Sequence, residues 1–66
     1  MKVGDKVLTA HGQGVVMGWE SFDLKGNSRE LSSVDNGNRV AVKLDEDHTW
    51  SFNGLYYERA LQLKVV

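Results

Sequence analysis

Short stretches that alternate apolar and polar residues most limit how this chain can fold. The stretch Asn38–Asp45 places large apolar residues at every second position, and His48–Phe52 and Leu61–Val65 repeat the pattern. This period is typical of strands with one buried face. Lys6–Thr9 and Gly14–Phe22 are also rich in residues that favour strands. The sequence therefore predicts an all-β protein with five short strands.

The length allows one domain, residues 1–66, with a thin core. A chain of this size buries only about 60% of the surface that its unfolded form exposes. It has no cysteine, so no disulfide can add stability. The N-terminal residues lack the apolar stretch of a secretory signal, and no run approaches the roughly 20 apolar residues of a membrane span. We therefore expect a cytoplasmic protein that does not enter a membrane.

The connections suggest how the strands are joined. Asp45–His48 is a tight polar link, which predicts an antiparallel hairpin between the third and fourth strands. Asp23–Asn38 is rich in Gly, Asn and Ser, and we expect a mobile loop there. Leu55–Arg59 is predicted to form one tight helical turn before the last strand. These elements predict a small five-stranded SH3-like barrel.

Three glycines at and inside the second strand have predicted roles. Gly12 and Gly14 are expected to permit a sharp corner before the strand, and Gly18 is expected to mark a bulge inside it. The inward positions of all strands should form one core. The predicted core residues are Val7, Val16, Val40, Val42, Leu44, Trp50, Leu61 and Leu63.

The segment Val3–Val16, with the sequence VGDKVLTAHGQGVV, resembles the opening of the Tudor-like C-terminal domain of UvrD-type helicases. It is similar also to the polymerase-interacting domain of CarD-type regulators and, more loosely, to KOW modules. The strand RVAVKLD and the segment LYYERALQL agree in outline with the later part of these domains. The resemblance implies an SH3-like fold and, as partner, RNA polymerase or, from the KOW modules, nucleic acid.

No residue pattern indicates an enzyme, a cofactor or a bound metal. Neither His11 nor His48 lies in a sequence motif typical of metal or acid–base sites. The acidic run Asp45–Asp47 is not followed by the glycine and glutamate of a calcium loop. We therefore expect a non-catalytic module.

Exposed aromatic and basic side chains are the best candidates for partner contacts. Tyr56 and Tyr57 are adjacent, so one should face the solvent. The candidate contact residues are Trp19, Arg39, Lys43, Tyr57 and Arg59.

Three kinds of function remain open from the sequence. A protein-docking module is favoured, because the net charge of −1 gives little long-range attraction to nucleic acid. A nucleic-acid module would use Arg39 and Lys43 on phosphates and an exposed ring on a base. A small phage or mobile-element accessory protein that acts as an oligomer is the third alternative. We expect a monomer or a small homo-oligomer.

Overall fold

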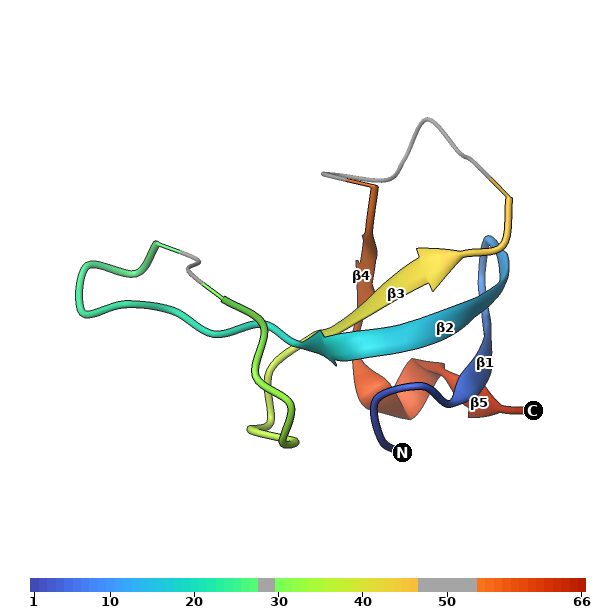
Figure 1. The fold of residues 1–66 in the computed structure, drawn as a ribbon, viewed down its shortest axis with the longest axis horizontal. Helices are drawn as coiled ribbons and strands as arrows, with labels where there is room; N and C mark the ends of the chain where they lie inside the picture. Colours follow the sequence, from blue (N-terminus) through green and yellow to red (C-terminus); the bar gives the residue numbers. More distant parts are fainter. Residues whose placement is uncertain (28–29, 47–53) are drawn as a thin grey trace.

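The computed structural model describes residues 1–27, 30–46 and 54–66. In this part the elements are β1 (Lys6–Thr9), β2 (Gly12–Trp19), β3 (Val40–Leu44), β4 (Tyr56–Glu58), the 3-10 turn η1 (Ala60–Gln62) and β5 (Lys64–Val65) (Figure 1). Neighbouring strands are antiparallel in one sheet with the order β4-β3-β2-β1-β5. The predicted fold class, an all-β protein with five antiparallel strands and a helical turn before the last strand, is confirmed.

The first hairpin forms where the alternating residues predict it. β1 has the predicted bounds, and β2 begins earlier than predicted because Gly12 pairs with Thr9. The Thr9 hydroxyl donates to the Gly12 carbonyl at 2.8 Å and accepts from the His11 amide at 3.0 Å. These bonds hold the tight turn that joins the two strands. Gly12 has a φ of +116°, which confirms the predicted corner at this glycine, whereas Gly14 does not have a positive φ.

β2 ends at Trp19, before the predicted limit at Phe22. Its pairing with β3 shifts by one residue between Val16 and Gly18, which confirms the predicted bulge. At Trp19 the backbone exchanges two hydrogen bonds with Ser32 of the long loop, at 2.8 and 2.9 Å. Glu20 donates its amide to the Arg39 carbonyl, and beyond it the chain leaves the sheet (Figure 1).

The C-terminal third differs from the prediction. The predicted strand His48–Phe52, and with it the predicted hairpin partner of β3, lies outside the described residues. The helical turn predicted over Leu55–Arg59 is wrong, because this stretch contains β4, which pairs with β3. The helical turn is η1, and it leaves only two residues for β5. Pairing with β3 satisfies the β4 backbone groups that an isolated helical turn leaves open.

Valine side chains and one tryptophan form the core. Val7, Val16, Trp19, Val40 and Val42 are fully buried or nearly so. The partly buried residues packed against them are Leu44, Ala60 and Leu63. Most of the predicted core is therefore confirmed, and Trp50 lies outside the described residues. Leu61 is wrong as a core residue: it is 85% exposed, because η1 turns its side chain away from the sheet.

The long loop is tied back to the end of β2. The Asp23 carboxylate accepts the amides of Lys25 and Asn27, both at 2.9 Å. Near the other end, the side-chain amides of Asn36 and Asn38 donate to the Glu20 carbonyl at 2.8 and 2.9 Å. The mobility of the loop stays a prediction, and these contacts locate its attachment points.

Candidate functional site

An ion pair between the end of β2 and the start of β3 organises the candidate site. Arg39 donates through Nε to Glu20 Oε1 at 2.5 Å and through Nη2 to Oε2 at 2.9 Å. The Glu20 side chain is only 8% exposed, whereas that of Arg39 is 54% exposed. The paired carboxylate raises the pKa of Arg39 above its ordinary value. The two-pronged geometry fixes the orientation of the guanidinium as well as its charge.

Arg39 is also held from a third strand. Its Cζ atom lies 5.6 Å from the ring centroid of Tyr57, in a cation–π contact. Tyr57 is in β4 and pairs with Ala41, two residues along the chain from Arg39. The guanidinium therefore joins the ends of β2, β3 and β4.

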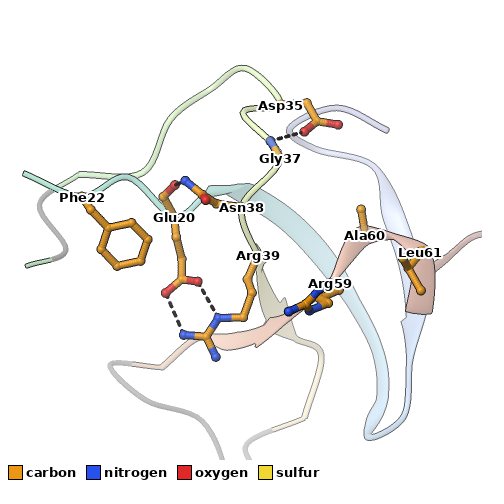
Figure 2. A pocket seen from close by; sticks show the side chains of 9 residues that line it. All are labelled: Glu20, Phe22, Asp35, Gly37, Asn38, Arg39, Arg59, Ala60 and Leu61. Atoms are coloured by element: carbon orange, nitrogen blue, oxygen red, sulfur yellow. Dashed lines mark hydrogen bonds and ion pairs between the residues drawn. The ribbon is translucent and has the colours of Figure 1, made fainter. Parts of the chain in front are cut away.

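A hollow of about 570 Å³ opens beside this ion pair (Figure 2). The lining residues are Glu20, Phe22, Asp35, Gly37, Asn38, Arg39, Arg59, Ala60 and Leu61. They come from the segment after β2, the returning loop, and the chain around η1. The volume is within the roughly 300–1,000 Å³ of ordinary ligand pockets.

The lining combines exposed apolar groups with balanced charge. Phe22 is 48% exposed and Leu61 is 85% exposed, and Figure 2 shows them on opposite sides. Glu20 and Arg39 neutralise each other, and Asp35 accepts the amide of Gly37 at 2.9 Å. In the described part of the chain, no carboxylate forms an ion pair with Arg59. A hollow of this kind suits a ligand that is partly apolar and carries at most one charged group.

The structure brings only some of the predicted contact residues together. Arg39 and Arg59 line the hollow, and Tyr57 supports Arg39. Lys43 is exposed on β3 and is not part of the lining. Trp19 is 1% exposed in the core, so its ring cannot contact a partner in this fold.

Most lining residues, among them Glu20, Phe22 and Leu61, were not among the sequence candidates for partner contacts. Phe22 and Leu61 were assigned to strands, and the carboxylate of Glu20 carried no predicted role. No local pattern marks these residues, because their place in the lining depends on where β2 ends and where η1 turns. The run of turn-forming residues Asp35–Asn38 was the available signal that the loop closes back on itself.

A second cluster lies on the core side of β4. The rings of His11 and Tyr56 meet edge to face, with centroids 4.8 Å apart. Burial, followed by the nearby charge of Glu58, raises the pKa of Tyr56 above its ordinary value. Among the described residues, Trp19 Nε1 and Glu58 Oε2 are buried side-chain atoms with no hydrogen-bond partner. Trp19 and Glu58 both pair with Val40, so the two side chains share one face of the sheet.

Within residues 1–27, 30–46 and 54–66, no three or more His, Asp or Glu side chains gather as metal ligands would. The same part of the chain contains no helix long and apolar enough to cross a membrane. Comparison of the chain with protein-family models, with curated proteins and with solved structures finds no match.

Proposed function

We propose that this chain is a non-catalytic module that docks a protein partner in the hollow between Phe22 and Leu61. The observation that carries the proposal is the exposure of two large apolar side chains around an arginine whose charge is already neutralised. Aromatic and arginine side chains in partly enclosed surfaces dominate the binding energy of many protein interfaces. By the resemblance of Val3–Val16, the partner class to test first is RNA polymerase.

The charge arrangement favours a protein over nucleic acid. Phosphate contacts depend on basic side chains that can replace counterions. Arg39 is committed to Glu20, and the lining as a whole has balanced charge. Two exposed basic side chains among the predicted contact residues remain to be tested for phosphate contacts. They are Lys43 in β3 and Arg59 directly before η1.

The test measures binding of purified bacterial RNA polymerase to the immobilised chain. Phe22→Ser and Leu61→Ser should each weaken binding about tenfold, because truncation of an interface anchor costs more than 1 kcal/mol. Leu24→Ser is the matched control, since Leu24 is fully exposed outside the hollow and should bind like wild type. Equal binding by all four proteins would contradict the proposal.

A parallel titration uses labelled single-stranded and duplex oligonucleotides at low and moderate salt. The informative variant is Lys43→Ala with Arg59→Ala, because Arg39→Ala would leave the buried carboxylate of Glu20 unpaired and risk unfolding. We expect weak binding that does not depend on these residues. Tight binding that salt and the double variant both abolish would instead establish a nucleic-acid module.

A further inference from the structure

The two arginines of the hollow differ in how many N–H groups they can still donate to a ligand. Arg39 uses Nε and Nη2 on Glu20, and its remaining N–H groups are uncommitted in the described part of the chain. Arg59 is exposed, and no described side chain pairs with its guanidinium. Since Val40 pairs with Glu58, Arg39 and Arg59 occupy the next opposed positions along the two strands. The Asp35 carboxylate also lines the hollow and accepts the Gly37 amide, so the position left for a single negative charge is at Arg59, which has no ion-pair partner in the described part of the chain.

The next residues along the chain supply an apolar wall. Ala60 and Leu61 follow Arg59 directly in η1 and line the same hollow. Arg59 itself has an extended backbone, with φ −67° and ψ 141°, at the entry to this turn. Figure 2 shows Arg59 between Arg39 and the Ala60–Leu61 wall. An anion at Arg59 therefore lies close to a surface that favours an apolar group.

The size of the hollow limits which ligands can supply both the anion and the apolar group. About 570 Å³ is the volume of a pocket for a drug-sized ligand, so the hollow holds a few residues and not a long segment. The last residue of a polypeptide carries a carboxylate on the same Cα as its side chain. If that side chain is apolar, one residue provides both the anion and the apolar group. An internal acidic residue would have to supply its apolar group from a neighbour that points away along an extended chain.

We infer that the hollow binds the C-terminal carboxylate of a partner protein whose last residue is large and apolar. This inference rests on the proposed docking function and specifies the partner segment. The carboxylate accepts hydrogen bonds from Arg59 and from the remaining N–H groups of Arg39. The terminal side chain packs on Ala60 and Leu61, and the preceding residue extends towards Phe22.

The experiment is an NMR titration of the isotope-labelled chain with three synthetic peptides. The first is acetyl-Ser-Gly-Ser-Ala-Leu with a free carboxylate, and the second is the same peptide with a C-terminal amide. The third, acetyl-Ser-Gly-Glu-Leu-Ser-Gly-amide, carries an internal carboxylate beside leucine. We expect the free acid to shift the amides of residues 59–61 and to bind about tenfold more tightly than the other two, as expected for charge-assisted hydrogen bonds.

Two variants separate the parts of the site. Arg59→Gln should remove the preference for the free acid over the amide, and Leu61→Ser should weaken both peptides. Equal binding of acid and amide to wild type would overturn the inference, as would tighter binding of the internal acidic peptide. If no peptide binds but Phe22→Ser and Leu61→Ser still lose RNA polymerase, the chain-end inference fails while the docking function stands. If the free acid binds as expected but no variant affects polymerase, the polymerase assignment fails while the chain-end site stands.

Discussion

At the scale of single residues, Gly14 shows that a glycine can be required for space instead of backbone freedom. A Cβ atom at this position would lie 2.5 Å from Val42 Cγ1 and 2.6 Å from the Lys43 carbonyl. Gly26 is the opposite case, with a φ of +84° and no atom within 4 Å of a built Cβ. A side chain at Gly26 therefore has space, but the backbone conformation implies strain in Gly26→Ala.

We predict that Gly14→Ala destabilises the chain more than Gly26→Ala. Overpacking of a buried strand typically costs roughly 1 to 3 kcal/mol, and here the backbone of β3 must also move. Gly26→Ala should cost about 1 kcal/mol through strain alone. Denaturant unfolding of both variants and wild type measures the difference. Equal losses for the two variants would show that β2 and β3 are not in such close contact.

The chain has only two tyrosines, so the ionisation of Tyr56 can be isolated. Burial and the charge of Glu58 place the pKa of Tyr56 above the ordinary value of 10.0. In Tyr57→Phe, ultraviolet absorbance should therefore report one tyrosine that ionises above pH 10. Glu58→Gln in the same background should lower that pKa, because a negative neighbour opposes formation of the phenolate.

The sign of this shift also predicts a stability effect. Because the folded state holds the Tyr56 proton more tightly, the contribution to folding is complete below pH 10 and is lost as the pH rises through the folded pKa. Tyr56→Phe should lack this loss. A pKa of Tyr56 at or below 10 would show that the ring is not buried as described.

At the scale of elements, η1 places two leucines in different environments. A continuous strand would place both side chains on the same face of the sheet. Leu63 packs against the core, whereas Leu61 is 85% exposed. We predict that Leu63→Ala lowers the free energy of unfolding by about 2 kcal/mol, because it removes buried methyl groups. Leu61→Ala should change it by less than about 0.5 kcal/mol. Thermal melting of the pair tests the position of η1, and a larger loss for Leu61→Ala would place the turn elsewhere.

The long loop is an element with defined anchors. Asn36 and Asn38 hold its end on the Glu20 carbonyl, and Ser32 pairs with Trp19. By contrast, Leu24 is fully exposed. This arrangement keeps Asp35 and Gly37 at the edge of the hollow, so the loop contributes to the site through its returning end.

At the scale of the whole molecule, β2 and β3 form the centre of the sheet. β2 is the longest strand, and both strands are paired along both edges in the described chain. We therefore predict that amides of Val16, Trp19 and Val42 exchange with solvent most slowly, at rates set by global unfolding. The two residues of β5 should exchange faster. Native-state hydrogen exchange measures both, and comparable protection of β5 would contradict this ranking.

Local patterns in the sequence determined the fold class, the bounds of β1, the bulge at Gly18 and the buried valines. Each of these follows from neighbours along the chain: alternation decides which valines share a face, and a glycine inside a strand permits an irregular backbone. The same patterns found two basic residues of the hollow, Arg39 and Arg59, because an exposed arginine among strand residues is visible locally.

The tertiary structure decided what those residues do. Glu20 and Arg39 are far apart in the sequence, and only the pairing of β2 with β3 makes them a bidentate ion pair. Likewise, the pairing of β4 with β3 turned a predicted helical turn into a strand, and η1 turned a predicted core leucine outwards. Trp19 became core for the same reason: its burial depends on what the rest of the sheet packs against it. Long-range pairing fixes these outcomes, and no local period encodes it.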